Sequence, residues 1–218
     1  MTGISLQWFK SLLNNERVLE ALYSSFWLAL TAASVSTILG IMASFVIVRR
    51  KILGRGAFTL LLVSPLLVPE VVTAVGLLLF AFLVGIKMNV FILLTGHVLL
   101  TLPYVSLLAQ SRIVGLKREH EEAAASLGAP PIDIFKRITL PLLVPTIVSA
   151  FALAAIVSFD NITATLFWKP AGFETLPTQI YSMMRNSISP ELNAVAAVIV
   201  LITTAVPSAV ILIARRSR

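Results

Sequence analysis

Long apolar runs that carry almost no charge dominate this sequence of 218 residues. A helix needs about 20 mostly apolar residues to cross a bilayer. Five runs meet that requirement: Ala21–Val48, Ala57–Ile86, Met88–Ser111, Ile138–Phe159 and Leu192–Ala214. Glu70, in the second run, is the only acidic, lysine or arginine residue inside them. The runs predict an all-α membrane protein with five transmembrane helices.

The composition excludes an ordinary soluble domain. Hydrophobic residues make up 58% of the chain and charged residues only 12%, and the mean hydropathy is +0.96. An average soluble protein is about 25% charged, so these charges could not cover a soluble surface of this size. The net charge of +7 would suit nucleic acid, but lysine and arginine also gather on the cytoplasmic loops of membrane proteins.

Lysine and arginine residues predict the orientation of the chain. Twelve of the 17 follow the first, third and fifth runs, which places those loops in the cytoplasm. We therefore expect an extracytoplasmic N-terminal tail, 1–20, and a transmembrane permease domain, 21–214. Within that domain, 112–137 would be a cytoplasmic loop and 160–191 an extracytoplasmic loop. Residues 215–218 would form a cytoplasmic tail.

The outward placement of 1–20 leaves two explanations open. This segment is polar, and ahead of the first run no basic region precedes a short apolar stretch of the signal-peptide type. A further helix before Met1 would carry it across the membrane. A short tail can also be translocated unaided.

The loop between the third and fourth runs predicts a helical hairpin. The residues up to Leu127 are good helix formers, Gly128 can adopt the left-handed cap, and Pro130 prevents continuation. Residues 132–137 can form a second short helix, and Pro141 then lies in the first turn of the fourth run, where its missing N–H costs little. Such a hairpin is either a handle for a cytoplasmic partner or an ordinary interfacial helix pair.

A group of residues in and after this hairpin resembles a known motif. The residues Glu122, Ala123, Ala124, Gly128, Ile138, Leu140 and Pro141 are similar to the EAA loop of ABC importer permeases. In that family the loop inserts into a groove of the ATP-binding subunit. The resemblance implies that these seven residues couple transport to ATP hydrolysis. Further similar segments are Ser64-Pro65, Pro69-Glu70, His97, Pro103-Tyr104, Ser158-Phe159-Asp160, Leu176-Pro177 and 189–194.

Together these segments are most similar to the second permease subunit of the spermidine/putrescine branch. The resemblance implies a type I ABC importer permease fold in the bacterial inner membrane, with the first family helix absent. It also implies three partners: a dimer of ATP-binding subunits, a second permease subunit and an extracytoplasmic solute-binding protein. The substrate would be a polyamine or a related amine, moved inward.

The chain is expected to need no cofactor of its own. An ATP-binding P-loop requires Gly-Lys before Ser or Thr, and no Gly-Lys dipeptide occurs here. ATP would therefore be bound and hydrolysed by a partner subunit, and this chain would not itself be an enzyme. Its histidines and carboxylates show no convincing metal-ligand spacing.

Two acids are candidates for a substrate pathway. A carboxylate inside the membrane costs about 2.5–3.5 kcal/mol and usually marks function. Glu70 lies inside the second run beside two prolines that can bend the helix, and Asp160 lies at the outer end of the fourth. Asn161 stands where polyamine members of the family often carry a second acid. Aromatic faces that would suit an amine are Phe159, Phe167, Trp168 and Tyr181.

Each candidate has a second interpretation. Glu70 can lie near the outer interface or pair with a neighbouring subunit, and Asp160 can cap a helix or contact the binding protein. Trp168 and Tyr181 are typical of the aromatic belt at a membrane surface.

Two other classes of protein remain open at this point. An ion-gradient-driven secondary transporter would need no ATPase. An intramembrane serine protease would use His97, a serine within hydrogen-bond reach and an oxyanion hole. Because no G-x-S-x-G elbow is present, His97 is better interpreted as a packed, hydrogen-bonded residue between helices.

Overall fold

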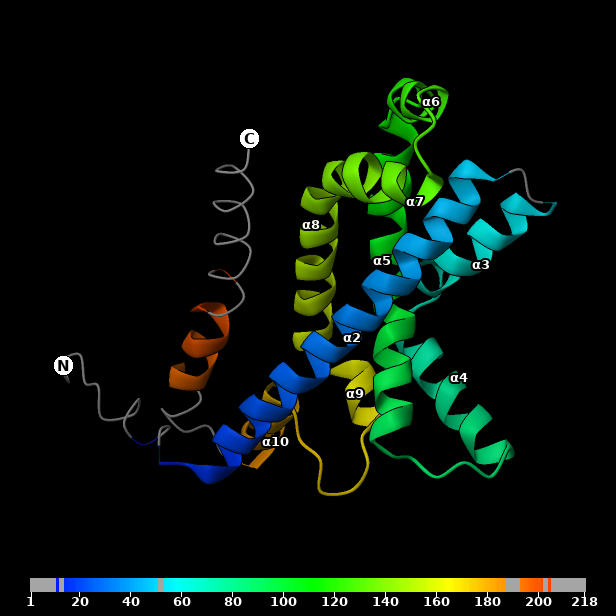
Figure 1. The fold of residues 1–218 in the computed structure, drawn as a ribbon. Coiled ribbons are helices and arrows are strands. Elements are labelled where there is room, and N and C mark those ends of the chain that lie inside the picture. The colour runs from blue at the N-terminus through cyan, green and yellow to red at the C-terminus, as the bar shows by residue number, and fades with distance from the viewer. Residues whose placement is uncertain (1–10, 12–13, 51–52, 187–192, 202–203, 205–218) are drawn as a thin grey trace.

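The computed structural model describes residue 11 and residues 14–50, 53–186, 193–201 and 204. Every regular element within these ranges is a helix. The long helices are α2 (Glu16–Arg49), α5 (Val90–Gly115) and α8 (Leu140–Phe159), and α2 crosses the other two diagonally (Figure 1). The helical residues 193–201 belong to the fifth predicted run, most of which lies outside the described residues.

Three helices in the described part of the chain are long and apolar enough to cross a membrane: Glu16–Arg49, Val90–Gly115 and Pro131–Phe159. They correspond to the first, third and fourth predicted runs. The first differs at its start, because residues 16–20, expected in the N-terminal tail, form the first turn of α2. The last includes a short π-helical segment, η1 (Phe135–Thr139), just before α8.

The second predicted run is not one straight helix. It forms α3 (Arg55–Leu67) and α4 (Glu70–Leu83), which meet at 106° (Figure 1). Val68 is extended, with φ −97° and ψ 133°, because a residue before proline avoids the helical region. Pro69 has no N–H to continue the helix, so α4 begins again at Glu70. The bent pair makes at most one further span.

Small side chains let α2, α5 and α8 approach closely. α2 buries Ala29, Ala33, Ser36, Gly40 and Ser44, and α8 buries Ala150 and Ala154. A Cβ added to Gly40 would lie 2.6 Å from Cγ1 of Val105 on α5, so only glycine fits there. This use of small residues is typical of helix packing in membranes, where interhelical contact depends on close van der Waals packing.

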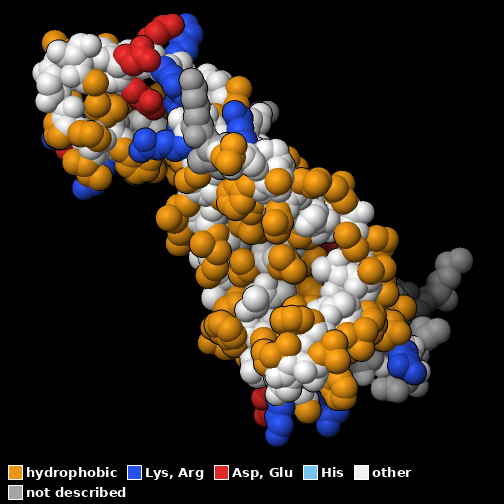
Figure 2. Space-filling view, turned by 90° about the vertical axis from the view of Figure 1, so that its right-hand side faces the viewer, with side chains coloured by type: hydrophobic (Ala, Val, Ile, Leu, Met, Phe, Trp, Pro, Cys, Tyr) orange, Lys and Arg blue, Asp and Glu red, His pale blue; other side chains and the backbone are white. Residues whose placement is uncertain are grey.

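Hydrophobic side chains cover the middle of the molecule. Figure 2 shows an apolar band between two ends at which charged side chains gather. Large side chains such as Met42, Phe80 and Phe91 are 58–72% exposed within this surface. An apolar surface of this extent would be unusual on a soluble monomer and is what hydrocarbon contact requires.

Candidate functional site

The first helix and the turn of the hairpin between α5 and α8 form as predicted, whereas its second helix continues into α8 instead of ending at residue 137. α6 (Glu119–Ser126) is followed by a turn at Gly128 and by α7 (Pro131–Ile134), which continues into η1. Gly128 has φ +85°, its N–H donates to the carbonyl of Ala125 (2.9 Å), and the N–H of Ala129 donates to Ala124 (3.1 Å). These two bonds make a Schellman motif, which satisfies the last carbonyls of α6.

The residues predicted to couple with an ATPase lie on the hairpin and just after it. Glu122, Ala123, Gly128 and Pro141 are exposed, whereas Ala124, Ile138 and Leu140 are half-buried. Leu127 and Ile132, which the motif does not include, are 89% and 56% exposed on either side of the turn. The hairpin therefore presents an apolar tip at one end of the molecule (Figure 1).

A polar contact that the sequence did not predict ties the hairpin to α2. Glu121 Oε1 lies 3.2 Å from an Nη atom of Arg49 at the end of α2, and it accepts a hydrogen bond of 2.8 Å from the Thr139 hydroxyl. A hollow of about 610 Å³ lies beside this contact, with Arg50, Arg118 and Glu122 also in its wall. Glu121 thus connects α6 to η1 and to α2, which lies 72 positions away at Arg49.

The π-helical turn explains how a proline fits near the start of α8. Pro141 offers no N–H, and its ring would crowd the carbonyl four residues earlier in a regular helix. In η1 the N–H of Leu140 donates instead to the carbonyl of Phe135, five residues back. Such wider turns occur mostly as single insertions and often lie at functional sites.

Away from the hairpin, the structure brings two predicted pathway residues together. Asn161 Nδ2 donates to Glu70 Oε1 over 2.6 Å, and the backbone N–H of Ala164 donates to the same oxygen over 3.3 Å. Glu70 is the first residue of α4, directly after the bend, and is exposed. Within the described residues, Glu70 Oε2 has no hydrogen-bond partner, so one carboxylate oxygen is open to a cation.

The other predicted pathway residues lie elsewhere. Asp160 follows the last residue of α8 and is exposed. Phe159 is buried, with its ring centroid 5.2 Å from that of Phe26 on α2. Tyr181 is 41% exposed on α10 (Leu176–Asn186). Glu70 and Asn161 are therefore the only predicted pathway residues that the described structure joins by a hydrogen bond.

For two residues, burial decides between the alternative interpretations. Trp168 is fully buried at the end of α9 (Thr163–Trp168), where its Nε1 donates to the carbonyl of Ala74 (2.8 Å), so the aromatic-belt interpretation is wrong for it. His97 is 1% exposed, and its two ring nitrogens lie 2.8 Å from Ser158 Oγ and 3.1 Å from Thr165 Oγ1. A serine is therefore within reach of His97, but both are sealed inside a three-helix contact that water and substrate do not reach.

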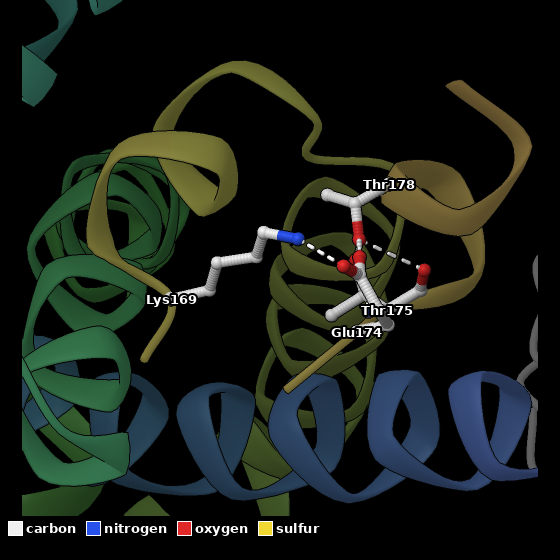
Figure 3. Close-up of polar contacts among 4 residues, drawn as sticks. All are labelled: Lys169, Glu174, Thr175 and Thr178. Atoms are coloured by element: carbon white, nitrogen blue, oxygen red, sulfur yellow. Dashed lines mark hydrogen bonds and ion pairs between the residues drawn. The ribbon is translucent and has the colours of Figure 1, made fainter. Parts of the chain in front are cut away.

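A separate cluster of hydrogen bonds and one ion pair stabilises the connection between α9 and α10. Lys169 forms an ion pair with Glu174, whose other oxygen accepts from the Thr178 hydroxyl over 2.6 Å (Figure 3). The Thr175 N–H donates to the Thr178 hydroxyl (3.0 Å), and the Leu176 N–H donates to Ser25 of α2 (2.7 Å). These contacts fold the segment after α8 back onto α2 instead of leaving it as a plain loop.

Comparison with known families defines the class of this protein. Residues 20–218 match the family described as the binding-protein-dependent transport system inner membrane component. The chain belongs to this family of ABC transporter permeases, as the hairpin residues predicted. Members are membrane-spanning subunits that lack an ATPase site of their own.

Curated relatives narrow the position of the chain within that family. It is 33% identical over 203 residues to the spermidine/putrescine transport system permease protein PotC of Haemophilus influenzae, covering 93% of this chain and 79% of that protein. It is 31% identical to PotC of Escherichia coli strain K12, covering 98% and 81%. The putrescine transport system permease protein PotI of the same strain is 34% identical, with 90% and 73% covered.

Solved structures share the fold at much lower identity. A chain of the MetNI methionine ABC transporter in an inward facing conformation aligns with a TM-score of 0.73, 15% identity and full coverage of both chains. A chain of an amino acid ABC transporter with histidines aligns with a TM-score of 0.71 and 17% identity, covering 99% of this chain and all of that one. These likenesses establish the fold alone.

Proposed function

We propose that this chain is the permease subunit of an ATP-driven importer that moves a polyamine into the cell. The observation that carries this proposal is 31–34% identity, over most of the chain, to permeases of spermidine and putrescine transport systems. A polyamine carries several positive charges on a flexible methylene chain. The open Glu70 oxygen offers one of these charges a partner.

The proposed complex contains a dimer of ATP-binding subunits, a second permease subunit and a solute-binding protein. The hairpin would lie in the cytoplasm, where its apolar tip around Leu127 and Ile132 fits the groove of an ATPase. The binding protein would dock at the opposite end, on the expected extracytoplasmic loop 160–191, in which Leu176 is hydrogen-bonded to Ser25 of α2. The C-terminus would be cytoplasmic, and a fifth span would include residues 193–201.

The mechanism follows from how the hairpin is attached. Because α7, η1 and α8 run as one continuous helix, a pull on the hairpin would move α8. The Glu121–Arg49 contact would transmit the same movement to α2. The helices α2, α5 and α8 pack too tightly to deform gradually, so a rigid-body movement of the bundle would alternate access between the two sides.

A substitution at Glu70 tests the proposed substrate pathway. The variant Glu70→Gln keeps the shape of the side chain but removes its charge. We expect it to lower spermidine uptake about tenfold, the effect of losing one charge-assisted hydrogen bond. The matched control is Glu20→Gln, which makes the same chemical change at an exposed position of α2.

The measurement is initial uptake of labelled spermidine by cells that express the tagged transporter, divided by the amount of assembled complex. The amount is obtained by purifying the tagged chain with its ATP-binding subunit and second permease. If Glu70→Gln transports as fast as Glu20→Gln, then Glu70 is not part of the pathway. If no ATP-binding subunit is recovered with the unmodified chain, the proposed assembly is wrong.

A further inference from the structure

A continuous line of hydrogen bonds connects the buried core to Glu70. Ser158 Oγ of α8 lies 2.8 Å from His97 Nδ1, and His97 Nε2 lies 3.1 Å from Thr165 Oγ1 of α9. The Thr165 hydroxyl donates to the carbonyl of Asn161 over 2.7 Å. Asn161 then donates through Nδ2 to Glu70 over 2.6 Å. The line therefore joins α5, α8, α9 and the first turn of α4.

The donors and acceptors along this line can be assigned. Asn161 Oδ1 accepts from the backbone N–H of Thr165 (3.1 Å), which fixes the side-chain amide with its NH₂ toward Glu70. Thr165 has one hydroxyl hydrogen and uses it on the Asn161 carbonyl, so it accepts from His97. His97 then carries its hydrogen on Nε2, and Nδ1 accepts from Ser158.

The three members of this line that precede Asn161 are buried, whereas Asn161 itself is half-buried. Ser158, His97 and Thr165 are 4%, 1% and 0% exposed. A polar group that loses its partner in such a place has no water to replace it, so these contacts hold one another in a fixed arrangement. The only exposed end is the Glu70 carboxylate, whose Oε1 is occupied by Asn161 and Ala164.

We propose that His97 and Thr165 are positioning residues for the amine site, which hold Asn161 on Glu70 Oε1 so that Oε2 faces the passing ammonium group. This inference rests on the proposed pathway role of Glu70. It assigns to the buried histidine a part in transport, beyond its packing between helices. This inference also explains why an uncharged residue, Asn161, lies beside Glu70. Asn161 orients the carboxylate instead of binding the cation.

The chain provides a closely matched pair of variants. Thr165 and Thr101 are both fully buried, and each hydroxyl donates to the backbone carbonyl four residues earlier in the chain, Asn161 for Thr165 and His97 for Thr101. Only Thr165 also accepts from the His97 ring. Thr165→Val and Thr101→Val therefore remove the same group from equally buried sites, one within the line and one outside it.

The experiment uses the complete transporter in proteoliposomes with spermidine and its binding protein. Two rates are measured, spermidine import and the ATP hydrolysis that the loaded binding protein stimulates. We expect Thr165→Val to lower import about tenfold, the effect of about one buried hydrogen bond, while ATP hydrolysis stays near normal. Thr101→Val and Thr165→Ser, which keeps the hydroxyl, should import at the normal rate. Equal loss of import in Thr101→Val, or equal loss of both rates in Thr165→Val, would show that the hydroxyl only stabilises the fold.

A double-mutant cycle with Glu70→Gln completes the test. If Thr165 acts through Glu70, Thr165→Val should have little further effect once the charge is gone. The same tenfold loss in both backgrounds would overturn the positioning role while leaving the pathway role of Glu70 intact. Normal import by Glu70→Gln alone would overturn both. If Thr165→Val does not assemble, Ser158→Ala carries the same cycle from the other side of His97, with the same outcomes.

Discussion

Single residues decide how closely the helices of this permease can pack. Gly96 on α5 faces the buried ring of Trp168, and a Cβ added there would lie 2.2 Å from Cε3 of the ring. The ring is held in place by its Nε1 hydrogen bond to Ala74 of α4. Through these two contacts the Trp168 side chain joins α4, α5 and α9.

Gly96→Ala should destabilise the protein by about 1–3 kcal/mol, the usual cost of overpacking a core. The matched control is Gly76→Ala on α4, where an added Cβ meets nothing within 4 Å. Thermal unfolding of the purified chain in detergent measures the difference. A melting temperature for Gly96→Ala equal to that of Gly76→Ala would contradict the packing described here.

At this scale, only residues with a local signal could be predicted from the sequence. Gly128 was predictable because glycine before Ala-Pro marks a helix end on its own. The hydrogen-bond partners of His97 were not predictable, because Ser158 and Thr165 lie 61 and 68 positions away and no periodicity connects them to it. The burial of Trp168 was missed for the same reason, since the buried side chains in its cluster come mainly from α2, α4 and α5.

At the scale of elements, the hairpin is the part with the most specific local geometry. Its turn depends on the positive φ of Gly128, and its attachment depends on the Glu121 contact with Arg49 and Thr139. The sequence predicted the hairpin and the position of its turn. It did not predict that α7 would continue through a π-helical segment into α8, because that continuity depends on the register around Pro141.

Replacements at Gly128 test whether the turn requires its left-handed backbone or the glycine residue itself. Asparagine tolerates a left-handed backbone, whereas valine is strained there by about 1–2 kcal/mol or more. We expect Gly128→Asn to keep most ATP-driven uptake and Gly128→Val to lose most of it. Uptake is measured per assembled complex, so a failure to insert is counted separately. Equal uptake by the two variants would mean that the left-handed turn is not required.

The bend between α3 and α4 could be predicted only in part from the local sequence. Pro65 and Pro69 indicated that the second apolar run could bend, and the structure breaks it at Val68. The angle of 106° could not be predicted, because α4 is held there by hydrogen bonds with Trp168 of α9 and with Asn161 just before α9.

At the scale of the whole molecule, the bundle has two polar ends separated by an apolar band (Figure 2). The hairpin lies at one end, and α9 and α10 lie at the other (Figure 1). Because the apolar runs were long and nearly uncharged, these runs alone predicted an all-helical membrane fold. The orientation rests on the distribution of lysine and arginine, and it stays a prediction.

The absence of cysteine from the natural sequence allows this orientation to be measured directly. Ser126→Cys places one thiol on the exposed hairpin, and Ala171→Cys places one in the exposed connection between α9 and α10. A membrane-impermeant maleimide added to intact cells should label Cys at position 171 but not at position 126. Inverted membrane vesicles should give the opposite result. Labelling of both positions from one side would contradict the proposed topology.

The central claim is that this permease is driven by ATP, and reconstituted transport tests it most directly. Proteoliposomes containing the chain with its second permease and ATP-binding subunits are supplied with the binding protein and labelled spermidine. We predict uptake that requires ATP on the hairpin side and continues when ionophores remove all ion gradients. Uptake that proceeds without the ATP-binding subunits and stops when an ion gradient is removed would contradict the account and identify a secondary transporter.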